Sequence, residues 1–433
     1  MLESLLRRPQ RLLVLLAAFM VILLLSTYLS LSSWGSEQIR TQLKHIPAMF
    51  GNQTCPTGDL LAYSNGSSLP NLFMSNIKTV EDLRPYAVRG DDGNLYPPEF
   101  YPKDINKAPR AKAAFISLVR NEELEGMKSS MREVEDRFNR KFGYPWIFLN
   151  DKPFSEEFKK GVSKMTRSPV HFGLVPQEHW SYPSWIDQDK AASQRKKMHE
   201  ANIIYGGSES YRHMCRFQSG FFWRHPLTYE LGLEYYWRVE PDIKIFCDVD
   251  YDPFLFMQLN NKAYGFTMSI HEYPLTIPTL WDETKKFVQA HPEYVAPDNA
   301  MGFITDKPNN IADSTYNMCH FWSNFEIGDL RFWRGQQYMD YFTTLDKAGG
   351  FFYERWGDAP VHSIAASIFL NRSQIHHFED IGYRHNPWNH CPANRAKYHD
   401  TGKCLCEPEQ SFDRDSYSCM NEWWRVSVEG PPK

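Results

Sequence analysis

The chain has 433 residues and a formal net charge of −4, with 48 basic and 52 acidic side chains. This balance excludes a strongly basic nucleic-acid-binding protein and a polybasic surface for anionic lipids. Aromatic residues make up 15% of the chain, with 13 Trp, 23 Tyr and 29 Phe. They suit either a large aromatic core or a cleft in which rings stack on sugars, and composition alone does not separate the two.

The N-terminal segment predicts a membrane anchor. Arg7, Arg8 and Arg11 precede an uncharged stretch over residues 12–31, which as a helix is about 30 Å long and matches a bilayer core. A cleaved signal peptide has a shorter apolar core, of about 7 to 15 residues, and ends in a small-residue cleavage site. The basic flank predicts a cytoplasmic tail over residues 1–11 and a type II, single-pass topology.

Residues 32–107 mix Pro, Gly, Ser and Asn with short apolar runs, which predicts a lumenal stem. Asn52, Asn65 and Asn371 each begin an Asn-x-Ser/Thr sequon. All three lie on the non-cytoplasmic side of the predicted anchor, in agreement with a protein of the secretory pathway.

The cysteines predict disulfides near the C-terminus. The last 43 residues hold four of the eight cysteines in a segment with little apolar periodicity: Cys391, Cys404, Cys406 and Cys419. In an oxidising lumen this pattern is typical of a disulfide-stapled tail, and it lacks the paired C-x-x-C spacing of a common zinc site. Three other cysteines lie in apolar runs and are expected to be buried thiols: Cys215, Cys247 and Cys319.

Residues 108–433 predict one large α/β domain with a Cys-rich C-terminal tail. Two apolar runs, 113–120 and 145–151, are expected to be strands, and the helical spacing over 122–141 between them completes a βαβ unit with a parallel sheet. Asn121 is the expected cap of that helix. Further strands are predicted in PVHFGLV, YYWRVEPD, IKIFCDV and KAYGFTMSI, and further helices near 193–202, 279–291 and 329–345.

Ligands bind beyond the carboxyl ends of strands in open α/β sheets. Arg120 ends the first predicted strand, so it is a candidate to contact a phosphate or a nucleobase, although a surface arginine is the equally simple interpretation.

Five carboxylates fall within the run from 235 to 254: Glu240, Asp242, Asp248, Asp250 and Asp252. Strand residues two apart share a side, so the first two are expected to project together, as are the next two. Such a cluster suits Mg²⁺ or Mn²⁺ holding substrate phosphates. The last carboxylate precedes Pro253 and is expected to cap the next helix instead.

Three later segments hold further candidates. Glu326 lies among aromatic residues, so its carboxyl group is expected to be either desolvated or held by compensating hydrogen bonds. Asp358 follows Glu354, Arg355 and a glycine turn and begins an apolar helix, which predicts a loop that delivers polar groups to a cleft. Four histidines follow as possible nitrogen ligands of Mn²⁺, although a single histidine is more often structural: His376, His377, His385 and His390.

Four strings in this order, YRHMCRFQSGFF, YYWRVEPDIKIFCDVDYDPF, YNMCHFWSNFEIGDLRFW and ERWGDAPVHSIAASIFL, resemble the fungal Golgi α-1,2-mannosyltransferases of glycosyltransferase family 15. The resemblance implies a GT-A-like fold, with a mixed, mainly parallel sheet flanked by helices. It also implies GDP-mannose as donor, a mannose-terminated N- or O-linked glycoprotein glycan as acceptor, Mn²⁺ as cofactor and retention of configuration in a Golgi membrane protein.

The resemblance also implies roles for single residues. The metal-site glutamate maps to Glu240 in the EPD triplet, beside Asp242, and the metal-associated histidine maps to His385. The acidic candidate nucleophile maps to Glu326, and an active-site tyrosine to Tyr211. Arg120, Asp242 and Asp358 are the expected donor-binding residues.

Two alternatives stay open at this level. Retention requires either a carboxylate nucleophile or attack by the acceptor on the face that GDP leaves, and Glu326 could be that nucleophile or could stabilise positive charge. A non-catalytic Golgi protein that binds glycans with the same fold is the alternative function, but a pure binder has no need of acids at Glu240, Asp242 and Glu326.

Overall fold

The computed structural model describes residues 79–99, 105 and 108–432. Within these ranges no helix combines the length and the apolar character needed to cross a membrane. The predicted anchor over residues 12–31 and the sequons at Asn52 and Asn65 lie outside them.

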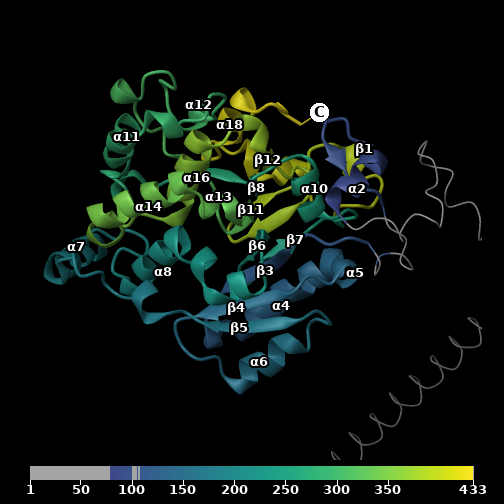
Figure 1. The fold of residues 1–433 in the computed structure, drawn as a ribbon, viewed down its shortest axis with the longest axis horizontal. Helices are drawn as coiled ribbons and strands as arrows, with labels where there is room; N and C mark the ends of the chain where they lie inside the picture. The colour runs from purple at the N-terminus through teal and green to yellow at the C-terminus, as the bar shows by residue number, and fades with distance from the viewer. Residues whose placement is uncertain (1–78, 100–104, 106–107, 433) are drawn as a thin grey trace, which may run out of the picture. The chain divides into compact units, whose positions relative to one another are not determined.

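A seven-stranded mixed sheet forms the centre of the domain, in the order β12-β8-β11-β6-β3-β4-β5 (Figure 1). Strand β11 runs antiparallel to both neighbours, and the other adjacent pairs are parallel. The start of β11 therefore lies at the same sheet edge as the carboxyl ends of β3, β4 and β6. The strands are β3 (Ala113–Leu118), β4 (Trp146–Asn150), β5 (Val170–Leu174), β6 (Tyr235–Val239), β8 (Tyr264–Phe266), β11 (Phe325–Asp329) and β12 (Ile375–His377).

Helices cover both faces of this sheet. The longer ones are α4 (Leu124–Val134), α6 (Glu156–Ser163), α7 (Gln188–Glu200), α8 (Glu209–Gly220), α10 (Pro253–Leu259), α11 (Leu280–Ala290), α14 (Gln336–Ala348), α16 (Asp358–Phe369) and α18 (Met420–Val426). Shorter helices are α2 (Val80–Leu83), α5 (Arg140–Phe142), α9 (Pro226–Glu230), α12 (Met301–Ile304), α13 (Leu330–Trp333), α15 (Gly350–Tyr353) and α17 (Arg395–Tyr398).

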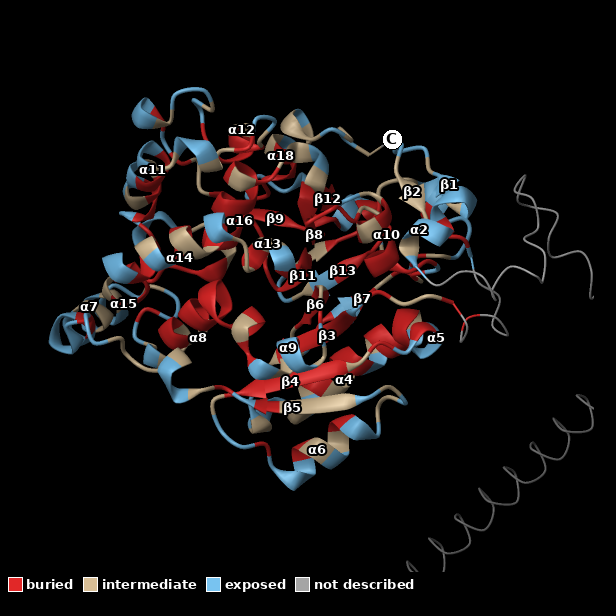
Figure 2. Cartoon of the chain, in the orientation of Figure 1, coloured by how far each residue is buried: buried red, intermediate tan, exposed pale blue. Residues whose placement is uncertain are grey.

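Alternate residues of the central strands face two separate cores, as the pleat of a strand requires. Phe115 and Trp237 pack with α4, α6 and α10, whereas Ile116 and Tyr236 pack with α8, α14 and α16. Figure 2 shows the central strands buried between these helices. Residues at the end of β6 on the side of Tyr236 therefore face α16.

Three small antiparallel sheets complete the fold. They pair β1 (Val88–Arg89) with β2 (Leu95–Tyr96), β9 (Ser269–His271) with β10 (Cys319–Phe321), and β13 (Tyr383–His385) with both β7 (Lys244–Ile245) and β14 (Trp388–His390). The predicted run 243–249 therefore gives only a two-residue strand outside the main sheet. The predicted run 262–270 divides into β8 and β9, which belong to different sheets.

Two predicted helix details are corrected. Gly335 separates α13 from α14, so the predicted helix over 329–345 is two helices. The side chain of Asn121 accepts a hydrogen bond from the Ser155 amide at 2.9 Å instead of capping its own helix. Asp252 does cap α10 as predicted, because its carboxylate accepts from the amides of Phe254 and Leu255.

Two disulfides attach the tail to the rest of the domain, Cys247–Cys404 and Cys319–Cys419, and a third, Cys391–Cys406, lies within the tail. The prediction of disulfides at the four tail cysteines is confirmed. The prediction of free thiols at Cys247 and Cys319 is wrong, because both lie buried beside tail cysteines, whereas Cys215 is buried and free as expected.

Residues 79–99 pack on the domain although their composition predicts stem. The Asn260 side chain donates to the Leu95 carbonyl at 2.8 Å and accepts from the Leu95 amide at 2.7 Å. Arg84 donates to the Leu259 carbonyl at 3.0 Å. Leu83 is also fully buried in the core that includes α10, and the Tyr96 ring packs on Phe256 with centroids 4.9 Å apart. Polar and apolar contacts therefore both fix this segment.

Candidate functional site

A cavity of about 720 Å³ opens at the edge where β3, β4 and β6 end and β11 begins. Arg120 follows β3, Asn150 ends β4, and Arg238 and Glu240 lie at the end of β6. Other lining residues come from much later in the chain: Ser323, Asn324, Arg355, Asp358, His385, Trp388 and Tyr417.

Arg238 is the centre of a charge network at the cavity. Its Nε donates to Glu240 Oε1 at 2.7 Å, and its Nη1 donates to Asp358 Oδ2 at 2.6 Å and lies 3.8 Å from Glu326 Oε1. Burial alone would lower the pKa of Arg238, but the carboxylates of Glu240 and Asp358 raise it well above its usual value. Arg238 therefore holds two acids of the cavity wall, Glu240 and Asp358, and lies close to a third, Glu326.

Asp358 is the first residue of α16 and lines the cavity. Besides Arg238, it accepts a hydrogen bond from the Ser323 hydroxyl at 2.8 Å. Burial opposes ionisation of this carboxyl group, but the charges of Arg238 and His362 prevail and lower its pKa. Asp358 is therefore an ionised acid in the cavity wall. This position agrees with the predicted segment that delivers polar groups to a cleft.

Glu326 lies behind this wall and has no exposed surface. Its Oε2 accepts from the Tyr264 hydroxyl at 3.0 Å and lies 3.1 Å from His362 Nδ1. His362 Nε2 lies 3.1 Å from the Gln218 carbonyl, so it donates there, and a proton between Nδ1 and Oε2 completes the pair. Hydrogen bonds from Tyr264 and His362 thus compensate for the burial of Glu326 Oε2. This is the second of the two environments predicted for Glu326.

Glu240 and His385 are both in the wall of the same cavity. Glu240 uses Oε1 to bind Arg238. His385 Nδ1 is buried without a hydrogen-bond partner among the residues that the structure describes, and the ring packs edge-on against Trp322. The other three candidate histidines do not line the cavity, because they pair elsewhere: His376 with Glu429, His377 with Thr267 and His390 with Asp413.

Arg120 and Tyr211 also line the cavity. Arg120 Nη2 donates to the Ser210 hydroxyl at 2.7 Å. The Tyr211 ring stacks on Tyr205 with centroids 4.6 Å apart, and the Arg355 guanidinium lies 5.2 Å from its centroid. Burial raises the pKa of Tyr211 well above its usual value, so its hydroxyl stays protonated and can donate a hydrogen bond.

The rest of the carboxylate cluster lies elsewhere, which corrects the predicted pairing along a strand. Strand β6 ends at Val239, and the chain turns at Asp242 with a φ of 60°, so Asp242 is exposed and does not line the cavity. Its carboxylate lies against Gly126, where an added Cβ would be 2.6 Å from Oδ2. Asp248 pairs with Arg137, and Asp250 with two lysines, in a separate part of the surface.

A family model described as glycolipid 2-alpha-mannosyltransferase matches residues 89–428. The chain belongs to this family. The glycolipid 2-alpha-mannosyltransferase of Saccharomyces cerevisiae is 55% identical over 332 residues, which are 77% of this chain and 73% of that protein. The alpha-1,2 mannosyltransferase KTR1 of the same yeast is 53% identical over 319 residues, 74% of this chain and 79% of that protein.

Solved structures of this family agree with the fold. Core-mannan synthase A from Aspergillus fumigatus, solved in an Mn/GDP form, has a TM-score of 0.68 and 46% identity, and the match covers 74% of this chain and 86% of that one. The mannosyltransferase Ktr4p from S. cerevisiae with GDP has a TM-score of 0.72 and 37% identity, covering 84% and 94%. The predicted family, enzyme class and mixed α/β glycosyltransferase fold are confirmed.

Arg238, Tyr264 and His362 belong to the charge network at the cavity but were not predicted as site residues from the sequence. Two had a usable signal. Arg238 precedes Glu240 by two residues at a strand end, and His362 follows Asp358 by four residues in a helix, so each shares a side with a predicted acid. Tyr264 lies on another strand and had no comparable signal.

Proposed function

We propose that this chain transfers mannose from GDP-mannose to mannose-terminated N- or O-linked glycans of glycoproteins, forming α-1,2 linkages with retention of configuration and with Mn²⁺ as cofactor. The observation that carries the proposal is one cavity that holds Glu240, His385, Arg120 and Asp358 beside a buried arginine. The relatives support it, because one is solved with Mn and GDP and another with GDP.

The residues present fit the proposed metal. Glu240 has one oxygen bonded to Arg238, and the buried His385 Nδ1 has no hydrogen-bond partner in the described part of the chain. A carboxylate oxygen and a neutral imidazole nitrogen are both ligands that Mn²⁺ accepts. Glu240 and His385 would hold Mn²⁺, which when bound would act as a Lewis acid on the charge that develops on the leaving diphosphate.

The surrounding residues orient the reacting groups. Arg238 fixes the Glu240 carboxylate through a charged hydrogen bond of 2.7 Å. Arg120 presents a cation from the wall to the phosphates or the base of the donor, and Asp358 presents an ionised carboxylate to the donor sugar. The protonated hydroxyl of Tyr211 supplies a hydrogen-bond donor in the same cavity.

For Glu326 the geometry supports an electrostatic role over direct attack. A nucleophile has to come within about 3.5 Å of the anomeric carbon, but Glu326 is fully buried and is not part of the cavity wall. Its Oε1 instead lies 3.8 Å from Arg238 Nη1. We therefore propose that the negative charge of Glu326 acts electrostatically on Arg238. The acceptor hydroxyl then attacks the anomeric carbon on the face that GDP leaves.

The test compares two neighbouring carboxylates. Glu240→Gln removes the charge of the proposed metal ligand, whereas Asp242→Asn is the matched control, because Asp242 is exposed and outside the cavity wall. We expect Glu240→Gln to abolish Mn²⁺-dependent transfer of radiolabelled mannose to α-methyl-mannoside, and Asp242→Asn to keep the wild-type Mn²⁺ titration. An unchanged titration for Glu240→Gln refutes the metal assignment. Product linkage is read by NMR.

We further propose a Golgi type II membrane protein with the anchor at residues 12–31 and a lumenal catalytic domain. The three disulfides support an oxidising compartment. Protease treatment of sealed Golgi vesicles should remove only the cytoplasmic tail, and cleavage of the catalytic domain in intact vesicles contradicts the topology.

A further inference from the structure

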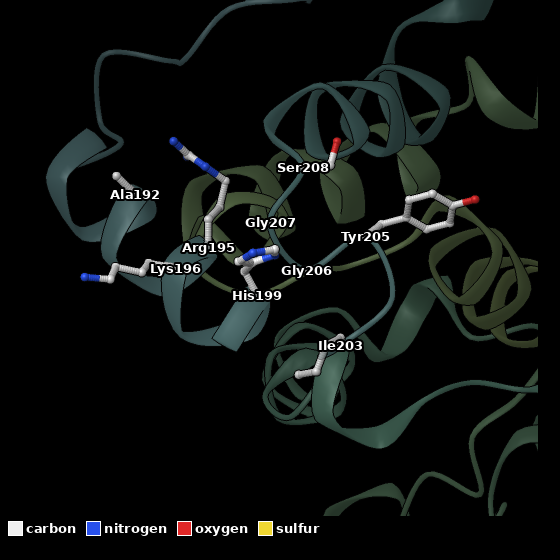
Figure 3. Close-up of a pocket in the computed structure, with 9 residues that line it drawn as sticks. All are labelled: Ala192, Arg195, Lys196, His199, Ile203, Tyr205, Gly206, Gly207 and Ser208. Carbon is white, nitrogen blue, oxygen red and sulfur yellow. The ribbon is translucent and has the colours of Figure 1, made fainter. Parts of the chain in front are cut away.

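A second hollow, of about 560 Å³, lies between α7 and the loop that leads into α8. Its lining includes Arg195, Lys196 and His199 of α7 and the loop residues Tyr205 and Ser208 (Figure 3). Tyr205 and Ser208 also line the larger cavity. The two hollows therefore share part of their wall at Tyr205 and Ser208 and are adjacent.

Tyr205 is held in an unusual and exposed position at this junction. Its backbone has a φ of 54°, in the left-handed region that non-glycine residues rarely adopt, and such strain is concentrated at functional sites. The residue is 57% exposed, although its ring stacks nearly parallel on Tyr211 with an interplanar angle of 8°. The exposed ring surface is a platform on which the apolar face of a pyranose can stack.

The charges of the hollow favour a neutral ligand. Arg195 pairs with Glu209 at 2.7 Å and donates to the Tyr182 hydroxyl at 2.6 Å. Lys196 lies 3.9 Å from a Glu200 oxygen. Arg195 thus has a close acidic partner, whereas Lys196 is exposed to solvent and only weakly paired, so the charge of the arginine is not free for a phosphate. Hydroxyl groups of a sugar, in contrast, can use the imidazole of His199 and the hydroxyl of Ser208.

The loop packs tightly on α7. A Cβ added at Gly206 would lie 2.8 Å from both the Ile203 carbonyl oxygen and Met198 Cβ. A Cβ at Gly207 would lie 3.1 Å from His199 Nδ1. Two successive glycines therefore let the loop approach the helix closely and fix the shape of the hollow.

We propose that this hollow binds the inner mannose residues of the acceptor glycan, and that the chain consequently prefers an acceptor of two or more mannoses to a monosaccharide. The inference rests on the proposed transferase function, whose larger cavity takes the donor and the terminal acceptor sugar. Tyr205 is then the stacking platform between the subsites, and His199 belongs to the extended subsite alone.

The experiment measures binding and transfer separately with the purified full-length chain. Saturation-transfer NMR titrations with α-methyl-mannoside and with α-1,2-mannotriose give two dissociation constants, and labelled-mannose transfer gives kcat/KM for each acceptor. The two additional mannoses, of which one stacks on Tyr205, should favour the trisaccharide by about tenfold or more. We expect Tyr205→Ala and His199→Ala to reduce this ratio to below about threefold, whereas Tyr229→Ala, an exposed tyrosine outside both hollows, keeps it.

Each outcome separates this inference from the proposed function. A wild-type protein that transfers mannose without preferring the trisaccharide overturns the inference and leaves the function intact. A length preference in binding that both variants lose, in a protein that transfers no mannose, supports glycan binding in the hollow but overturns the proposed function and the assignment of that glycan as an acceptor. A preference that survives in both variants places the inner sugars elsewhere and overturns the inference.

Discussion

Replacing Arg238 by methionine tests the buried charge network directly. The Arg238 side chain is 9% exposed, bonds Glu240 and Asp358 at 2.7 and 2.6 Å, and lies 3.8 Å from Glu326. Methionine fills similar space but leaves the carboxylates without their cation, and removal of one partner of a buried pair costs roughly 3–5 kcal/mol. An unfolding entropy of about 2.1 cal/mol/K per residue over roughly 350 residues converts this cost to a fall in Tm of about 4–7 °C.

Differential scanning calorimetry in the presence of a chelator measures this change without a contribution from bound metal. Arg132→Met is the matched control, because Arg132 forms an exposed ion pair with Asp136 on the surface, and the expected loss is below about 1 kcal/mol. Asp358→Asn in the Arg238→Met background should recover part of the loss, since it removes one of the unpaired charges. A fall in Tm below about 2 °C, or full additivity of the two substitutions, refutes the reasoning.

Three further outcomes are expected. Glu326→Gln should lower kcat on the order of 10²-fold with little change in the KM for GDP-mannose, because it removes the charge beside Arg238; near-normal turnover removes Glu326 from the proposed site. Alanine at both Cys319 and Cys419, which are 100 residues apart, should destabilise the chain more than alanine at both Cys391 and Cys406, which are 15 apart. If loop entropy dominates, the free energy of unfolding measured in urea falls by about 4.7 and 3 kcal/mol, respectively. The reverse order contradicts the loop-entropy explanation. Burial lowers the pKa of His390, but Asp413 and Glu379 raise it to about 9. Protonated His390 therefore stabilises the fold fully below about pH 6.5, and the free energy of unfolding decreases by roughly 3 kcal/mol as the pH rises through 9. The urea midpoint of His390→Gln should lose this part of its pH dependence, and an unchanged pH dependence contradicts the assignment.

The main strands could be predicted because each is short, apolar and directly followed by polar residues. This pattern located β3, β4, β5 and β6 and placed Arg120 and Glu240 at their ends. It failed at 243–249, where the chain pairs with the late strand β13. It also failed at 325–329, because the aromatic residues of this segment give no alternating pattern that would indicate β11. Both cases depend on partners far along the chain, which local periodicity does not report.

The site was predictable where a side chain lies directly at a strand end, and not where its role depends on packing. Asp242 lies two residues beyond Glu240, but a left-handed turn directs the chain away from the cavity. Cys247 and Cys319 have the apolar neighbours of buried thiols, and only the position of the tail shows that they are paired. His362 reaches Glu326 because α16 covers one particular face of the sheet.

The cavity wall extends from Leu118 to Tyr417 in the sequence. During translation nearly the whole catalytic domain is therefore synthesised before the last residues of this wall. A polypeptide that stops after the acid-rich strand but before the β13–β14 hairpin holds Glu240 without His385. Synthesis through Tyr417 is thus needed to complete the wall, and nonsense variants before the β13–β14 hairpin should be inactive even though most of the sheet can form.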